Sequence, residues 1–265
     1  MYEDGIGRNE RQLLWLGLAL LGLATAFQFI WGGQGGFVAA QSLTNRFPDW
    51  LWESLTVLGD ERVLLALMLP FCWRYPKVFW SLVLAALIGG LIGRGLKVWL
   101  EIPRPAAVLA VDQITIIGSR LMNKSFPSGH TISAFTFAAV WLGMLGWRKT
   151  WPLLIVAALA GFSRVAVGAH WPLDVLGASA IGVLGAWLGI GLARHWRWGL
   201  RIRPHRGLVC LAALAVATLP FEDQGYPDSQ VIRLAVCLWG LAGFAVYYLL
   251  PLLRGGWRGQ DRFEA

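Results

Sequence analysis

Three short polar motifs hold the residues of this chain that could perform chemistry. They are KVWLEIPRP with Lys97 and Arg104, FPSGHT with Ser128, Gly129 and His130, and SRVAVGAHWPLD with Arg164, His170 and Asp174. Fixed cations bind a phosphoryl group well, because guanidinium groups donate paired hydrogen bonds to its oxygens. One histidine can attack phosphorus while another protonates the departing oxygen. The set therefore predicts phosphoryl transfer.

The second motif predicts an anion site at the start of a helix. Ser128 has the character of an N-cap, and Gly129 lets backbone amides approach a ligand closely. His130 then falls in the first turn, where free N–H groups favour negative charge. Taken alone, this motif is better explained as an ordinary turn and cap, and Lys97 with Arg104 could equally be a basic helix end that reaches the lipid headgroups.

The third motif places His170 and Asp174 four residues apart, on one face of a helix. Such a carboxylate holds one imidazole nitrogen protonated and leaves the other free to attack. A purely structural pair is the alternative. The sequence lacks an acidic cluster suited to Mg²⁺, an H-E-x-x-H motif suited to Zn²⁺, and a P-loop. We therefore predict that the chemistry uses no metal and no cofactor.

The composition predicts a membrane protein. Hydrophobic residues make up 57% of the chain and charged residues 14%, and the mean hydropathy is +0.56, whereas a soluble domain carries about 25% charged residues. The net charge of +8 comes from basic clusters between apolar runs, which indicates membrane topology rather than nucleic-acid binding. The cysteines form no metal or redox pattern, so Cys72, Cys210 and Cys237 are predicted to be buried thiols.

The apolar runs predict an all-α, polytopic transmembrane helical bundle. A helix needs about 20 apolar residues to cross a bilayer. We expect eight spans, at about 13–31, 51–73, 78–102, 131–145, 151–167, 173–193, 207–220 and 231–253. Asp60, Glu61 and Arg62 interrupt the second span, and they either pair near a cavity or precede it. The seventh is short enough to thin the bilayer or to be re-entrant.

Basic residues predict the orientation of these spans. They fall in alternate loops, which are cytoplasmic by the positive-inside rule. The cytoplasmic set is Arg8, Arg11, Arg74, Lys77, Arg148, Lys149, Arg194, Arg197, Arg201, Arg203, Arg206, Arg254, Arg258 and Arg262. The opposite loop FEDQGYPDSQ holds no basic residue. Both termini are thus predicted to be cytoplasmic, with the three motifs at the outer face.

The motifs resemble the tripartite signature of the type 2 phosphatidic acid phosphatase (PAP2) superfamily, which reads K-x6-R-P, P-S-G-H and S-R-x5-H-x3-D. The sequence matches every defined position between Lys97 and Asp174. The resemblance implies that His170 forms a phosphohistidine, that Asp174 orients it, and that His130 is the general acid. It implies that the phosphate is held by Lys97, Arg104, Ser128, the amide of Gly129 and Arg164.

The resemblance also implies how the chain is divided. Residues 1–200 would hold the six-helix PAP2-like core. Residues 201–265, with two further spans, would form a C-terminal extension for which the family pattern does not account. The extension could mark a subfamily, a dimer contact or a lipid gate, and the sequence does not set the oligomeric state.

A site at the outer face of the bilayer favours a lipid phosphate as substrate. The resemblance implies a bacterial inner-membrane lipid phosphatase, with undecaprenyl diphosphate or phosphatidylglycerophosphate expected first and lipid A as another possibility. Segment 106–126, with Arg120, Asn123 and Lys124, is predicted to cap the site and to set selectivity. Two other functions stay open: a lipid phosphotransferase, and a transporter or scaffold that binds lipid phosphates without cleaving them.

Overall fold

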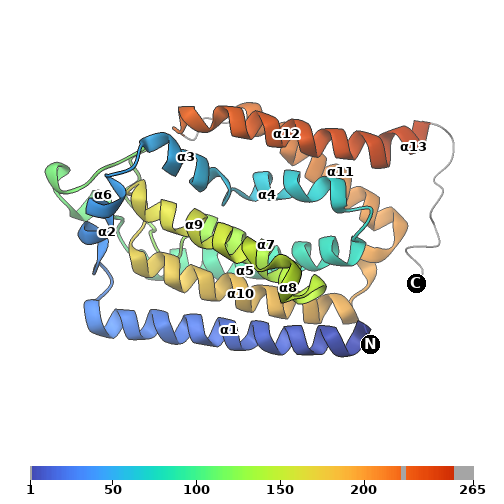
Figure 1. Ribbon diagram of the computed structural model, residues 1–265, viewed down its shortest axis with the longest axis horizontal. Coiled ribbons are helices and arrows are strands. Elements are labelled where there is room, and N and C mark those ends of the chain that lie inside the picture. The colour runs from blue at the N-terminus through green and yellow to red at the C-terminus, as the bar shows by residue number, and fades with distance from the viewer. Residues whose placement is uncertain (1, 222–224, 254–265) are drawn as a thin grey trace.

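The computed structural model describes residues 2–221 and 225–253, which form helices joined by turns and loops (Figure 1). The predicted all-α class is confirmed for these residues. The helices are α1 (Tyr2–Trp31), α2 (Phe37–Thr44), α3 (Asp49–Val57), α4 (Glu61–Met68), α5 (Pro76–Leu100), α6 (Pro105–Val108), α7 (Gly129–Leu145), α8 (Trp147–Thr150), α9 (Pro152–Ala166), α10 (Pro172–His195), α11 (Ile202–Ala217), α12 (Gln230–Phe244) and α13 (Leu250–Leu253), with a π-helical turn Ala245–Leu249 between the last two.

The described residues include five helical stretches that are long and apolar enough to cross a membrane. They are Gly7–Trp31, Pro76–Val108, Pro172–His195, Ile202–Phe221 and Pro227–Leu253. α7 and α9 are apolar as well but shorter, with 17 and 15 residues. The seventh predicted span is longer than expected, because the stretch that begins with α11 runs for 20 residues. The chain is thus a polytopic helical membrane protein.

The second predicted span is not one helix, and the prediction of a continuous helix over 51–73 is wrong. α3 ends at Val57 and α4 begins at Glu61. Asp60 is the N-cap of α4, and its Oδ1 accepts hydrogen bonds from the backbone amides of Arg62 at 2.8 Å and Val63 at 3.3 Å. A side chain that caps a helix competes with continuation of the preceding one. Asp60 and Arg62 therefore mark a helix boundary.

α10 is the central helix of the bundle and packs closely on α5 and α7. A Cβ at Gly189 would lie 2.6 Å from the Ala85 backbone of α5, and one at Gly182 would lie 2.8 Å from the Ile132 carbonyl oxygen of α7. Small residues of this kind let helix backbones approach closely inside a membrane. Since α10 begins beside His170, this packing fixes the start of the helix that carries Asp174.

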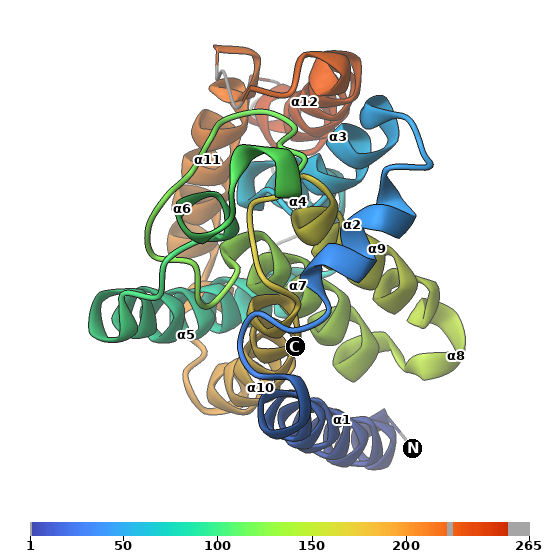
Figure 2. The same cartoon turned by 90° about the vertical axis from the view of Figure 1, so that its left-hand side faces the viewer.

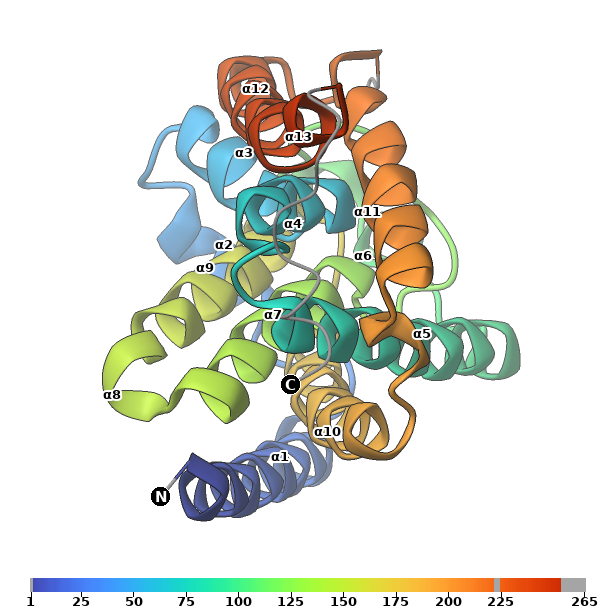
Figure 3. The same ribbon diagram turned by 90° about the vertical axis from the view of Figure 1, so that its right-hand side faces the viewer.

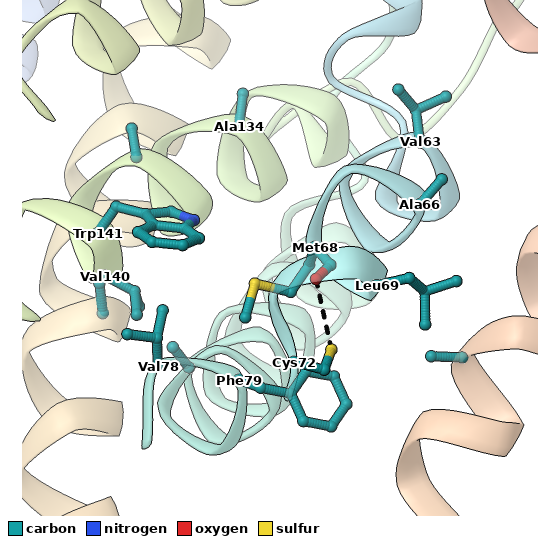
Figure 4. Packing of buried hydrophobic residues seen from close by; sticks show 14 of the residues in the cluster. Val63, Ala66, Met68, Leu69, Cys72, Val78, Phe79, Ala134, Val140 and Trp141 are labelled. Atoms are coloured by element: carbon teal, nitrogen blue, oxygen red, sulfur yellow. Dashed lines mark hydrogen bonds between the residues drawn. The ribbon is translucent and has the colours of Figure 1, made fainter. Parts of the chain in front are cut away.

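The core between α4, α5 and α7 contains large apolar side chains. Figure 4 shows Met68 and Cys72 packed near Phe79 of α5 and Trp141 of α7. Cys72 and Cys237 are buried, as predicted, but Cys210 is exposed, so the prediction of a buried thiol is wrong there. Cys210 lies on the exposed face of α11, where the thiol takes the place of an apolar side chain that faces lipid.

The two ends of the bundle differ. In Figures 1 and 2, α2, α6 and the loops around them gather at one end. Figure 3 shows the opposite end, where α1 begins and α8 and α13 lie. The beginning of α1 and the end of the described chain are thus on the same side of the bundle. The predicted cytoplasmic residues Arg254, Arg258 and Arg262 lie outside the described residues.

Candidate active site

Asp174 lies in the first turn of α10 and orients His170. α10 begins with Pro172, whose fixed backbone suits the first helical position. The Asp174 Oδ2 atom accepts hydrogen bonds from the Trp171 amide at 2.9 Å and from His170 Nδ1 at 3.3 Å. The hydroxyl of Ser125 donates to the same oxygen. Both His170 and Asp174 are buried, so the ring and the carboxylate are held in one arrangement.

A glycine turn holds His170 next to Arg164. The amides of Ala169 and His170 donate to the Arg164 carbonyl oxygen at 3.0 and 3.1 Å, which closes the end of α9. Gly168 takes a φ of +75° in this turn, and a Cβ there would lie 2.4 Å from the Thr115 carbonyl oxygen. Only glycine satisfies both constraints. The two motif residues are therefore fixed relative to each other by backbone.

The contacts of His170 define which ring nitrogen carries the hydrogen and which has the free lone pair. Arg104 Nη1 lies 3.3 Å from His170 Nε2, and because arginine has only donors, Nε2 must accept. Nδ1 then carries the hydrogen and donates it to Asp174. Burial and the charges of Arg104 and Arg164 lower the pKa of His170 well below its usual value. The ring is thus neutral at pH 7, with its Nε2 lone pair facing a cation.

Arg104 and Lys97 are tied to the backbone of the loop that precedes α7. Arg104 donates from Nε to the Asn123 carbonyl oxygen at 2.8 Å, and Lys97 Nζ donates to the Lys124 carbonyl oxygen at 2.8 Å. Arg104 Nη1 also donates to the Ala169 carbonyl oxygen at 2.9 Å. The predicted cap 106–126 therefore lies against the site, and it holds the cations through backbone carbonyls.

Arg164 is positioned by residues that the motifs do not include. Its Nη1 donates to Thr56 Oγ1 at 2.6 Å and to the hydroxyl of Tyr226 at 3.0 Å. The residue is only 4% exposed. Thr56 comes from α3, and Tyr226 from the connection between α11 and α12. The guanidinium is thus fixed from two parts of the chain that are distant in sequence.

The FPSGHT motif begins α7 as predicted. Ser128 is the N-cap, and its hydroxyl oxygen accepts from the Thr131 amide at 3.4 Å and the Thr131 hydroxyl at 2.9 Å. The Ser128 amide donates to the Asp174 carbonyl oxygen at 3.3 Å, which joins this motif to α10. A Cβ at Gly129 would meet no atom within 4 Å. The backbone there is open to a ligand.

His130 presents a ring nitrogen without a hydrogen-bond partner. Its Nε2 is buried and unbonded among the residues that the structure describes. Arg164, Asp60 and Arg104 are close enough to act on the ring electrostatically. Buried polar atoms in native proteins are normally satisfied, so an exception requires an explanation. A ligand atom between the cations would supply the missing partner.

The structure brings the predicted residues to one place and adds three that the sequence reasoning missed. His170, Asp174 and Arg104 are in direct contact, and the others are joined to them through carbonyls or neighbouring charges. Ser125, Thr56 and Tyr226 were not predicted. Ser125 could have been suspected from its position just before FPSGHT. Nothing in the local sequence distinguishes Thr56 or Tyr226 from ordinary helix and loop residues.

Fold and site together define a helical membrane protein in which a neutral histidine lies among arginine and lysine side chains, an arrangement suited to binding a phosphoryl group. The family profile of the PAP2 superfamily matches residues 78–199, which include all three motifs. Phosphatidylglycerophosphatase B of Bacillus subtilis is 31% identical over 153 residues, which cover 51% of this chain and 71% of that protein. The chain belongs to the PAP2 superfamily.

Two further similarities agree with this assignment. Undecaprenyl-diphosphatase BcrC of Bacillus subtilis is 39% identical over 84 residues, 31% of this chain and 40% of that protein. The crystal structure of Aquifex aeolicus LpxE superposes with a TM-score of 0.54 at 28% identity, and the match covers 58% of this chain and 92% of that one. The chain spans only 32 to 57% of the length of the undecaprenyl-diphosphatases that head the curated relatives.

Proposed function

We propose that this protein is a membrane lipid phosphatase that hydrolyses a phosphomonoester or diphosphate through a phosphohistidine intermediate. The observation that carries the proposal is the chain of contacts from Arg104 to His170 Nε2, and from His170 Nδ1 to Asp174. These contacts hold a neutral imidazole nitrogen within the electrostatic reach of Arg104, Arg164 and Lys97. An oriented imidazole alone is compatible with many reactions. An oriented imidazole together with nearby cations favours attack on an anionic phosphorus centre.

The proposed reaction has two steps. In the first, His130 is doubly protonated when the anionic substrate is bound; His170 Nε2 attacks phosphorus, the bond from phosphorus to the leaving oxygen breaks, and the His130 imidazolium gives a proton to that oxygen. In the second, water attacks the phosphohistidine, the nitrogen–phosphorus bond breaks, and His130 accepts the proton of the water. Inorganic phosphate leaves and the neutral imidazole returns. Arg104 Nη1, which contacts Nε2 in the resting state, turns to a phosphoryl oxygen when substrate binds.

The cations stabilise the charge that spreads over the phosphoryl oxygens in the transition state. Lys97, Arg104 and Arg164 supply this charge as fixed groups, and prearranged donors of this kind cost no reorganisation during the reaction. The hydroxyl hydrogen of Ser128 and the amide of Gly129 complete the cradle at the start of α7, where the helix end favours an anion.

A lipid phosphate is the proposed class of substrate. The pocket lies at one end of the bundle, so we expect it at the depth of the headgroups when the helices span a bilayer. A cavity of about 410 Å³ lies beside the site and extends from Trp31 at the end of α1 to Trp171 and Asp174. Its size suits part of a lipid molecule. Relatives named undecaprenyl-diphosphatase, phosphatidylglycerophosphatase and lipid A 1-phosphatase support undecaprenyl diphosphate and phosphatidylglycerophosphate as the first substrates to test, followed by lipid A.

Phosphate release by the purified full-length protein tests this function. We expect release from at least one of the three lipids, and the same rate with and without EDTA, because fixed cations neutralise the phosphoryl charge. Loss of activity with EDTA that Mg²⁺ restores would contradict the mechanism. The substrate phosphate can be radiolabelled. Label that appears on an acceptor lipid instead of in inorganic phosphate would then indicate a phosphotransferase. Binding without release from any lipid would indicate a transporter or scaffold.

We propose that the site faces the outside of a bacterial inner membrane and that both termini are cytoplasmic. The basic residues of the predicted cytoplasmic set support this orientation. Gln230 is exposed at the start of α12, near the site end. A Gln230→Cys variant in a background without the native cysteines should react with an impermeant thiol reagent in intact cells. Reaction only after lysis would show the opposite orientation.

A further inference from the structure

The two C-terminal helices reach the active site through the loop that joins them. Tyr226 lies on this loop and is 6% exposed. Its hydroxyl accepts a hydrogen bond from Arg164 Nη1 at 3.0 Å, and the Arg164 Cζ lies 5.9 Å from the centroid of its ring. The family profile ends at residue 199. Tyr226 therefore brings to the phosphate site a contact from outside the matched region.

Two other segments, α3 and the cap, fix the position of Tyr226. The Asp228 amide donates to Glu53 Oε2 at 2.7 Å, which ties the loop to α3. Gly118, in the cap, leaves room for the ring, since a Cβ there would lie 2.5 Å from Tyr226 Cε1. Trp52 and Ile117 pack with Tyr226 in one buried cluster. Tyr226 is thus held in a fixed position beside Arg164.

The hydrogen bonds of Arg164 determine which edge of its guanidinium is free. Nη1 carries two hydrogens, and Thr56 and Tyr226 accept both of them. Nε is buried and makes no hydrogen bond to any residue that the structure describes. The edge formed by Nε and Nη2 is therefore the one available to bind two phosphoryl oxygens, which is the paired geometry that arginine favours.

We propose that Tyr226 is a positioning residue that aims the Nε and Nη2 edge of Arg164 at the phosphoryl group. This rests on the proposed function and extends it: the C-terminal extension belongs to the active site. Tyr226 does not contact the phosphate and acts through Arg164. Without its hydroxyl, one Nη1 hydrogen loses its acceptor inside the protein, and the guanidinium is free to rotate toward another acceptor.

A Tyr226→Phe variant tests the proposal, because it removes only the hydroxyl. We expect kcat/KM to fall about 10-fold or more, the effect of losing one hydrogen bond to a charged group. Binding of orthovanadate, a phosphate mimic, should weaken by a similar factor. Tyr247→Phe is the matched control, since Tyr247 is exposed in the π-helical turn that follows α12, and it should behave as the wild type.

A double-mutant cycle separates positioning from general stability. With Arg164→Lys there is no Nη1 to hold, so adding Tyr226→Phe should change kcat/KM and orthovanadate binding by less than about 2-fold, because coupled residues are not additive. Equal losses from Tyr226→Phe in both backgrounds would show a merely structural role and overturn the inference. Wild-type values for Tyr226→Phe would overturn it as well.

The same measurements distinguish this inference from the proposed function. Wild-type protein that releases phosphate while Tyr226→Phe is unaffected would overturn only the role of Tyr226. Wild-type protein that releases no phosphate, but whose orthovanadate binding depends on Tyr226 only when Arg164 is present, would overturn only the enzymatic function. Wild-type protein without release and without orthovanadate binding would overturn both.

Discussion

Replacing His170 with alanine is expected to reduce phosphate release by at least about 10⁴-fold, because removing a covalent nucleophile leaves only the contribution of binding and electrostatics. The effect should be this large since no other described side chain is placed to substitute: His130 lies in the first turn of α7 and is proposed to transfer the proton. With radiolabelled substrate, the wild type should give a labelled protein on rapid quenching. His170→Ala should give none.

His195→Ala is the control for this substitution. His195 is the last residue of α10, at the opposite end of the helix that follows His170; it is exposed, and its Nδ1 lies 2.9 Å from the Gly191 carbonyl oxygen. We expect wild-type release and wild-type labelling. Retention of phosphate release by His170→Ala, in protein shown by thermal unfolding to be folded, would refute the phosphohistidine mechanism and favour direct attack by water.

Replacing Asp174 with asparagine is expected to lower kcat by about 10³- to 10⁴-fold, the size of effect known when the carboxylate that orients a catalytic imidazole is changed to an amide. The Oδ2 atom accepts from Ser125, Trp171 and His170. An asparagine amide group turned toward His170 would favour the tautomer with its hydrogen on Nε2, which cannot attack. KM should change little, because Asp174 is not proposed to touch the phosphate.

Asp112→Asn is the matched control for Asp174→Asn. Asp112 is exposed in the cap, and its substitution should leave kcat within about 2-fold, as surface changes away from special contacts usually do. A rise in KM without a fall in kcat for Asp174→Asn would mean that the carboxylate serves only to shape the pocket. In that case His170 would be oriented by Arg104 alone.

Local sequence was sufficient for much of the fold. The lengths of the apolar runs predicted α1, α5, α10 and the last span, since a helix buries its own backbone polar groups and needs only apolar side chains to enter lipid. The prediction from local sequence failed at the second span, because Asp60 caps α4 within what reads as one long apolar run. A cap and an interruption of a helix have the same composition, and only the backbone geometry distinguishes them.

The sequence by itself determined which residues could do the chemistry, because the types and spacing of His170, Asp174 and Arg164 predict their roles when they lie on one short segment. Their electrostatic state and their supports were decided by the tertiary structure. The tautomer of His170 follows from its contact with Arg104, 66 residues away. The free edge of Arg164 follows from Thr56 and Tyr226, which lie 108 and 62 residues away. A hydrogen bond between distant segments exists only once the helices have packed, so no local pattern in the sequence records it.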